Sequence, residues 1–196
     1  MKPTLLFLCC FALQHSFAQT DYLKQGNQYL GEQNYLAAEK IFKQAAQSDS
    51  NNLIYQCQLA LALLSQSKHA EAQAVLDKVL AKEPSNTGAL WYAGINSFQN
   101  KSGDLRKGIG YFEKALTNLN QSQGQYYSAN WYIGRSYHIL LTTTGLSYNE
   151  VSRMLECYST YIKPQPDADD AKQIAAFVKH IKEVRPPQNV QKWVLQ

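Results

Sequence analysis

The sequence has little of what enzymes use for chemistry. It contains only 4 His residues, and no two of them stand at a metal-ligand spacing such as i, i+4. It has no Gly-x-Ser-x-Gly elbow and no Gly-Lys-Ser/Thr phosphate loop. Asp167, Asp169 and Asp170 lack the central Gly and final Glu of an EF-hand, so a helix start explains them better. We therefore predict that the protein is not an enzyme and uses no cofactor or metal.

Charge is modest and dispersed. The chain carries 19 Lys and Arg against 15 Asp and Glu, a formal net charge of +4. Nucleic-acid binding needs a concentrated basic face, and a membrane-surface helix needs a basic amphipathic stretch. The sequence has neither. It therefore predicts no nucleic-acid partner, and any association with the cell envelope would be peripheral and made through other proteins.

Cysteine is scarce. Of the 4 Cys, Cys57 and Cys157 fall in different units of a repeat of about 34 residues, too far apart for the Cα separation of about 7 Å that a disulfide allows. No CxxC motif or flanking His activates either thiol. We expect both to be buried free thiols, as is usual for unpaired Cys. The alternative is that one of them is exposed and reactive.

The N-terminus has the features of an export signal. Met1-Lys2 gives a positive start, an apolar run follows over Leu5–Leu13, and small residues lie around Ser16–Ala18. This pattern predicts a signal peptide over residues 1–18, cleaved after Ala18, and export to the periplasm or the extracellular space. The run is short for a membrane span, and the residues before Cys9 match a lipoprotein signal poorly. An uncleaved anchor and a lipoprotein signal are the alternatives.

A fixed repeat dominates the rest of the chain. Gly26, Ala60 and Gly94 are evenly spaced, with a step of about 34 residues. The same step relates further pairs: Ala38 and Ala72, Phe42 and Leu76, Ala45 and Val79. A period in this range is typical of stacked helix pairs, which bury their apolar faces against one another.

These residues resemble the tetratricopeptide repeat family. Its pattern has Gly or Ala and an aromatic residue on the first helix, and Ala, Phe and Ala on the second. The first unit supplies these as Gly26, Tyr29, Ala38, Phe42 and Ala45. The resemblance implies an all-α fold, a right-handed solenoid of about four helix pairs. Together with the export signal, this repeat type suggests a secreted bacterial protein. The predicted segments are repeats at about 19–52, 53–86, 87–122 and 126–164, a capping helix at 167–185 and a tail at 186–196.

The later units depart from the pattern. In the fourth, Gly134 lies on the first helix, an enlarged turn is expected at Thr142–Gly145, and Tyr158 occupies a position that the family usually gives to a small residue. The capping helix has an apolar stripe and one polar face, which suits the end of a solenoid; a partner-docking helix is the alternative. Trp193 and its apolar neighbours in the tail either dock on the capping helix or engage another protein.

The resemblance also implies where a ligand binds, because first helices of the family line a concave groove. The groove residues predicted in this way are Asn27, Leu61, Trp91, Ile95, Phe98, Trp131, Arg135 and His138. Trp and Arg are frequent binding hot spots, so we expect Trp91, Phe98, Trp131 and Arg135 to anchor a partner segment. The alternative is that the two Trp residues fill the interior. The family's clamp for C-terminal carboxylates is not expected, since only Asn27 matches it.

The predicted function is a non-enzymatic protein–protein interaction scaffold or adaptor in the periplasm or cell envelope, which binds a protein or peptide partner in its groove. The alternative is a structural subunit that self-associates or belongs to an outer-membrane assembly or secretion complex. The pattern does not identify the partner.

Overall fold

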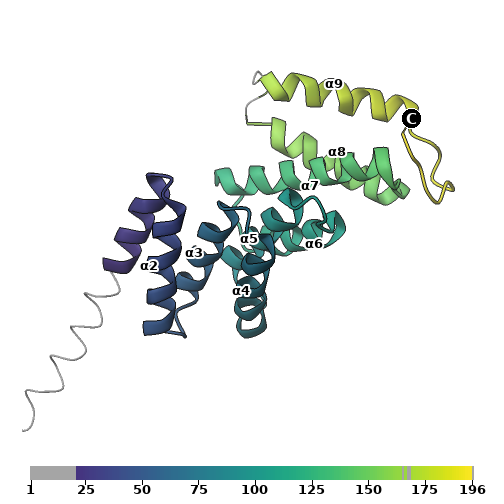
Figure 1. Cartoon of the computed structure of the whole chain (residues 1–196). Coiled ribbons are helices and arrows are strands. Elements are labelled where there is room, and N and C mark those ends of the chain that lie inside the picture. Colours follow the sequence, from purple (N-terminus) through teal and green to yellow (C-terminus); the bar gives the residue numbers. More distant parts are fainter. Residues whose placement is uncertain (1–20, 165, 167–168, 196) are drawn as a thin grey trace, which may run out of the picture. The chain divides into compact units, whose positions relative to one another are not determined.

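The computed structural model describes residues 21–164, 166 and 169–195 (Figure 1). The predicted signal peptide and Asp167, the expected cap of the last helix, lie outside the described residues. The chain divides into two compact units between Pro84 and Ser85.

The first unit consists of two successive helix pairs. Residues 21–31 are helical and pair with α2 (Tyr35–Ser48), and α3 (Leu53–Leu64) pairs with α4 (His69–Lys82). The Asn34 side chain caps α2 by accepting from the Ala37 amide, and Asn52 caps α3 in the same way through Ile54. Gln33 and Ser67 both have φ of 58° in the turn within each pair. The step between them is the same as that between Gly26 and Ala60, so the two turns repeat along with the helices.

The small residue on each first helix makes room for a large residue on the second. A Cβ added to Gly26 would lie 2.3 Å from Cζ of Phe42. In the next pair, Ala60 and Leu76 are both fully buried. Gly26 is thus paired with the phenyl ring of Phe42, whereas Ala60, which has a one-carbon side chain, is paired with the smaller side chain of Leu76. Side-chain volume across the pair explains why a poor helix former such as glycine stands inside a helix.

A carboxylate network fastens the first unit. Glu39 on α2 is 8% exposed, and its two oxygens accept from Lys43 at 2.9 Å and Lys68 at 2.7 Å. Gln66, in the turn before α4, donates to the same carboxylate at 2.9 Å. The hydrogen bond from Lys68, opposed in part by burial, helps to lower the pKa of Glu39 to about 2. The network therefore joins the second helix of one pair to the turn of the next.

The second unit comprises α5 (Thr87–Gln99), α6 (Leu105–Leu116), α7 (Gly124–Thr143), α8 (Tyr148–Ile162) and α9 (Asp169–Val184). Each helix packs against the one that follows it. Asn86 and Asp104 cap α5 and α6, and α8 starts with a capping box in which Ser147 and Glu150 bond each other's backbone. These are the side chains that favour helix starts.

The fourth helix pair corrects one sequence prediction. Tyr158 is not at the small-residue position of the pattern: a Cβ on Gly134 would lie 2.7 Å from its Cδ1, just as one on Gly94 would lie 2.7 Å from Phe112. Tyr158 therefore occupies the place that Phe112 takes one pair earlier. The turn is also shorter than predicted, since Thr142 and Thr143 still belong to α7.

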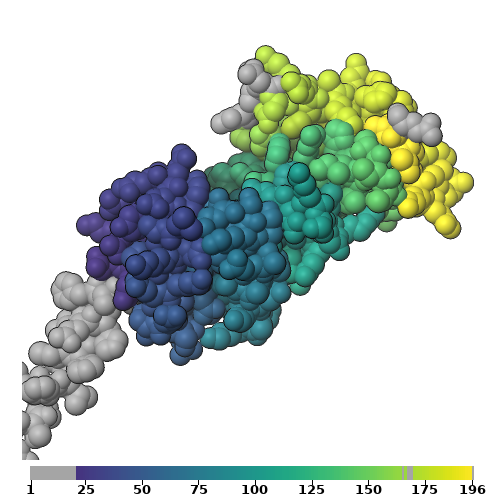
Figure 2. All heavy atoms as spheres, viewed as in Figure 1, coloured from purple at the N-terminus to yellow at the C-terminus, as the bar shows by residue number. Residues whose placement is uncertain are grey.

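The C-terminal tail docks on its own chain. Trp193 exchanges two backbone hydrogen bonds with Leu146, each 2.8 Å long, and the Leu195 amide donates to the Leu141 carbonyl at 3.0 Å. In Figure 2 the yellow tail lies directly against green atoms of the α7 region. Of the two alternatives, docking is observed, but its anchor is the connection from α7 to α8 rather than the capping helix.

Both described cysteines are buried free thiols, as predicted. Burial raises the pKa of Cys57 to about 11 and that of Cys157 to about 12, so neither is a reactive thiolate near neutral pH. Within residues 21–164, 166 and 169–195, the structure contains no helix with the length and hydropathy to span a membrane.

Candidate functional site

A cavity of about 520 Å³ opens beside α7 in the second unit, here called the α7–α9 cavity. This volume lies within the range of about 300–1,000 Å³ that is usual for ligand pockets. Its lining residues come from α5, α7, α8 and α9, and they are Phe98, Trp131, Arg135, His138, Tyr158, Asp170, Gln173, Ile174 and Phe177.

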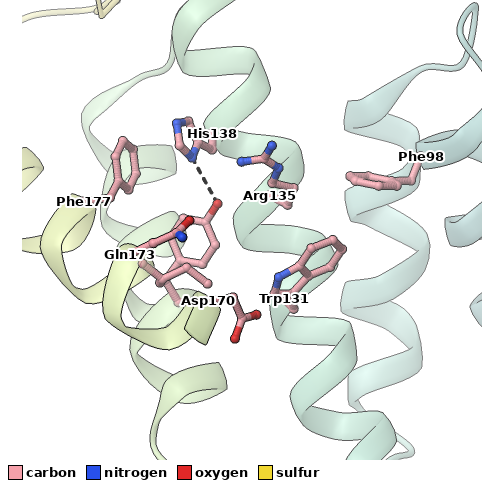
Figure 3. Close-up of a pocket in the computed structure, with 9 residues that line it drawn as sticks. Phe98, Trp131, Arg135, His138, Asp170, Gln173 and Phe177 are labelled. Carbon is pink, nitrogen blue, oxygen red and sulfur yellow. Dashed lines mark hydrogen bonds between the residues drawn. The ribbon is translucent and has the colours of Figure 1, made fainter. Parts of the chain in front are cut away.

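One face of α7 supplies the central wall. Trp131, Arg135 and His138 follow one another at i, i+4 and i+7, so they project from the same side of the helix. The opposite side of α7 is buried in the core through Ala129 and Ile133. Figure 3 shows His138 beside Phe177 of α9, and Trp131 between Phe98 of α5 and Asp170 of α9. At about 1.5 Å of rise per residue, this wall is about 10 Å long from Trp131 to His138.

Aromatic rings form one end of the cavity. The ring centroids of Phe98 and Trp131 are 5.9 Å apart, and Tyr132 lies edge-on to both, at 5.1 Å and 5.0 Å. Such packed pairs hold their rings in fixed orientations. Phe98 and Trp131 remain partly exposed, so they offer rigid apolar area to a ligand.

The other wall comes from α9. Phe177 stacks on His138 with centroids 3.8 Å apart and planes 13° apart, while Ile174 and Gln173 line the same side. Sequence reasoning missed this contribution, because it assigned α9 to capping. The apolar stripe that it noted includes Ile174 and Phe177, so the signal was present. The sequence did not reveal that this stripe of α9 lies against α7.

Burial keeps two titratable side chains of the lining, His138 and Tyr158, uncharged at neutral pH. His138 Nδ1 is 3.2 Å from the Tyr158 hydroxyl. Burial, with a smaller effect of nearby Arg135, lowers the pKa of His138. Burial raises the pKa of Tyr158 to about 12. At neutral pH the charged groups among the described lining residues are therefore Arg135, which is exposed, and Asp170, which is partly buried.

A second cavity of about 360 Å³ lies next to the first, and Asp170 lines both. Its remaining lining residues are Ser122, Gly124, Tyr127, Ser128, Tyr161, Pro164 and Ala171. The Tyr161 hydroxyl donates to Asp170 Oδ2 at 2.6 Å, which raises the pKa of Tyr161 to about 12. Asp170 is thus a fixed carboxylate on the border between an apolar space and a polar one.

The structure brings together four of the predicted groove residues. Phe98, Trp131, Arg135 and His138 line the α7–α9 cavity. Trp91 and Ile95 are partly buried and pack against the core of the second unit instead.

The remaining predicted residues lie elsewhere. Trp91 is edge-on to Phe112 and to Tyr132, at 5.6 Å and 6.0 Å, which is the interior packing that the alternative interpretation described. Asn27 and Leu61 belong to the first unit, where Asn27 is exposed and Leu61 partly exposed. Among the residues that the structure places, no group of three His, Cys, Asp or Glu could hold a metal ion.

Comparison with known proteins identifies the fold. The sequence matches no protein-family model and no curated protein. The structure is similar to that of MamA, with a TM-score of 0.65 and 18% identity over 86% of this chain and 84% of the other. It is also similar to a tetratricopeptide repeat protein from Parabacteroides merdae, with a TM-score of 0.59 and 12% identity over 85% of this chain and 60% of the other.

A third solved structure is YrrB, described as a tetratricopeptide repeat protein with an unusual peptide-binding site. Its TM-score is 0.58 and its identity 19%, over 84% of this chain and 76% of the other. These likenesses confirm the predicted all-α fold of tetratricopeptide type. At such low identity they establish the fold alone.

Proposed function

We propose that the protein is a non-enzymatic interaction scaffold and that its α7–α9 cavity holds a segment of a partner protein. The observation that carries this proposal is the wall of α7, where Trp131, Arg135 and His138 project into a cavity closed on the far side by Phe177 and Ile174. Rigid aromatic area next to a charged group is the composition of binding hot spots.

The chemistry of the cavity supports binding over catalysis. His138 is neutral and held between the ring of Phe177 and the hydroxyl of Tyr158. Tyr158 is itself a protonated phenol at neutral pH, since burial raises its pKa to about 12. A general base needs a free nitrogen directed at a substrate proton, whereas this imidazole serves as part of a packed wall. The peptide-binding site named for YrrB adds support by analogy of fold.

We also propose that the protein acts outside the cytoplasm, as a periplasmic or extracellular adaptor. The basis is the leader pattern of residues 1–18 in the sequence. Intact-mass measurement of the protein from fractionated cells of its native source tests this directly. A mature chain that begins at Gln19 in the exported fraction is expected, and an unprocessed chain in the cytosolic fraction would contradict it.

The binding proposal is tested by selecting peptides from a random library displayed on phage against the purified protein. Enriched peptides are then synthesised, and their affinities are measured by calorimetry. Trp131→Ala should weaken binding at least tenfold, because a hot-spot side chain contributes about 2 kcal/mol or more. Tyr111→Ala, which removes an aromatic ring from α6 outside the cavity, is the matched control and should leave the affinity unchanged.

Two results would count against this function. One is a library that yields no binder, and the other is binders whose affinity is unaffected by Trp131→Ala in a variant with native circular dichroism. Sedimentation of the same preparation shows whether the chain instead self-associates, as the structural-subunit alternative predicts.

A further inference from the structure

Building on the proposed function, we propose that the partner segment is an extended peptide with a bipolar pattern. A central apolar side chain occupies the α7–α9 cavity against Trp131, an acidic side chain faces Arg135, and a basic side chain enters the second cavity beside Asp170. Three features of the cavities support this pattern: the spacing of the lining residues along α7, the two charges, and the border that the cavities share at Asp170.

The spacing along α7 matches that of an extended chain. Tyr127, Trp131 and Arg135 follow one another at i, i+4 and i+8 and line the two cavities in this order. Each such step along a helix rises about 6 Å. In an extended peptide, side chains on one face recur every second residue, at about 6.6 Å. Alternate side chains of such a peptide therefore meet successive lining residues of α7.

The cation at one end is Arg135. It lies one helical turn from Trp131 in sequence and is exposed. The next lining residue on the same face, His138, has a lowered pKa and adds no charge. An acidic side chain that reaches this end of the cavity would meet a guanidinium, the group best suited to bind a carboxylate.

The anion at the other end is Asp170. Tyr161 fixes one of its oxygens at 2.6 Å, and the remaining described lining of the second cavity is uncharged: Ser122, Ser128 and Tyr127 add hydroxyl groups. A Lys or Arg side chain in this space would meet the carboxylate of Asp170 between the side chains of Tyr127 and Tyr161, and a carboxylate attracts a cation. A second acidic side chain there would be repelled.

The centre between the charges is apolar. Phe98 packs 5.9 Å from Trp131, and Ile174 and Phe177 are further apolar residues of the lining. A leucine or an aromatic side chain would bury its surface there at about 25 cal/mol per Å². Arg135 on one side and Asp170 on the other then determine the order of the acidic and basic side chains of the peptide, and so the direction in which the peptide lies.

The test uses defined fluorescent peptides and the purified protein. Four peptides on a Gly-Ser background carry Glu-x-Leu-x-Lys, Lys-x-Leu-x-Glu, Glu-x-Leu-x-Glu or Lys-x-Leu-x-Lys. Fluorescence anisotropy gives their affinities. One of the two bipolar peptides is expected to bind at least tenfold more tightly than either like-charged peptide, and replacing its Leu with Ser should abolish most of the binding.

Charge reversal identifies which protein group reads which peptide group. Arg135→Glu should weaken the preferred bipolar peptide about tenfold and strengthen the all-Lys peptide. Asp170→Lys should also weaken the preferred bipolar peptide about tenfold, but it should strengthen the all-Glu peptide. Lys114→Glu, an exposed charge reversal on α6, is the matched control and should change none of the four affinities by more than twofold.

The outcomes separate the two proposals. If library-selected peptides bind in a Trp131-dependent way but the four defined peptides show no charge preference, the bipolar pattern is wrong and the scaffold function stands. The same holds if a like-charged peptide binds most tightly. If neither library nor defined peptides bind, both proposals fail.

Discussion

The ring of Tyr158 lies over Gly134 so closely that a Cβ on this glycine would be 2.7 Å from Cδ1 of the ring. Phe112 stands in the same relation to Gly94, and Phe42 to Gly26. Three of the four helix pairs thus share one packing contact: a glycine on the first helix leaves room for an aromatic ring from the second. The contact fixes how closely the two helices approach.

Gly134→Ala should therefore destabilise the protein by about 1–3 kcal/mol, because the added methyl group overpacks a core in which Tyr158 is 1% exposed. Gly110→Ala is the matched control: it lies within α6, and an added Cβ would meet nothing within 4 Å. That change should instead stabilise the helix by about 0.5–1 kcal/mol. Urea unfolding followed by circular dichroism measures both. Equal effects of the two substitutions would contradict the packing argument.

Most of the fold could be predicted from the sequence because its period is carried by core residues. The repeat step holds through Gly26, Ala60 and Gly94, where turn lengths are constant. It fails at Gly134, which comes later in the chain than one further step from Gly94 would place it. Loop insertions change the spacing between residues without changing which side chains pack together. The place of Tyr158 in the repeat pattern is therefore shown by its contact with Gly134 and could not be obtained by counting residues along the sequence.

The candidate site could be predicted only in part. Helical periodicity determines which side chains share a face, so the sequence could predict that Trp131, Arg135 and His138 lie on one face of their helix. It did not separate Trp131 from Trp91, because the difference lies in the neighbours: Phe112 and Tyr132 enclose Trp91. The contribution of α9 to the lining of the cavity depends on the angle at which that helix packs, and no local sequence pattern encodes this angle.

The network of Glu39 should make the stability depend on acid pH. Its pKa is lowered from 4.5 to about 2 in the folded chain, so the unfolded chain takes up the proton first. The stabilisation is complete above pH 4.5 and is lost as the pH falls toward 2. Glu39→Gln should cost about 1–2 kcal/mol at pH 7, and the difference from the original protein should disappear near pH 2.

Unfolding in urea at a series of pH values checks this prediction. Glu32→Gln is the control, because Glu32 is exposed in the turn before α2 and accepts a single side-chain bond, from Gln28, among those the structure describes. A pH-independent difference between Glu39→Gln and the original protein would show that the carboxylate has no role in the network.

His138 should contribute a second dependence on pH, in a different range. Burial lowers its pKa below the ordinary value of 6.5, and Arg135 on the same helix adds to this. Asp170 of α9 is the other charged side chain among the described residues that line this cavity. The unfolded chain is protonated first, so the free energy of unfolding should fall as the pH drops below 6.5.

His138→Gln, which stays neutral, should remove this fall between pH 7 and pH 5. Chemical unfolding of the two proteins across that range is the measurement. His180→Gln is the control, since His180 is exposed on α9. If the His138 variant and the original protein lose stability in parallel over this range, the buried imidazole is not the cause.

The junction between the tail and the α7–α8 connection predicts a coupled effect. Gly145 has φ of 81°, and an added Cβ would lie 2.9 Å from the Trp193 carbonyl oxygen. Gly145→Ala should cost about 2–3 kcal/mol, of which about 1–2 kcal/mol comes from the backbone conformation alone. In a chain truncated after Gln191 the contact is gone, so the cost should fall to the backbone part.

A double-mutant cycle of Gly145→Ala and the truncation, measured by thermal and urea unfolding, gives the coupling energy. A coupling near zero would mean that the tail does not rest on Gly145 in solution.

The distribution of tryptophan has a practical consequence. All 3 Trp residues of the chain lie after Ser85, at positions 91, 131 and 193. Trp131 faces the α7–α9 cavity, while Trp193 rests in the tail junction. Tryptophan fluorescence therefore reports on the second unit and not on the first. Binding of a ligand should change the emission of Trp131, and release of the tail should change that of Trp193, so neither measurement needs an attached dye.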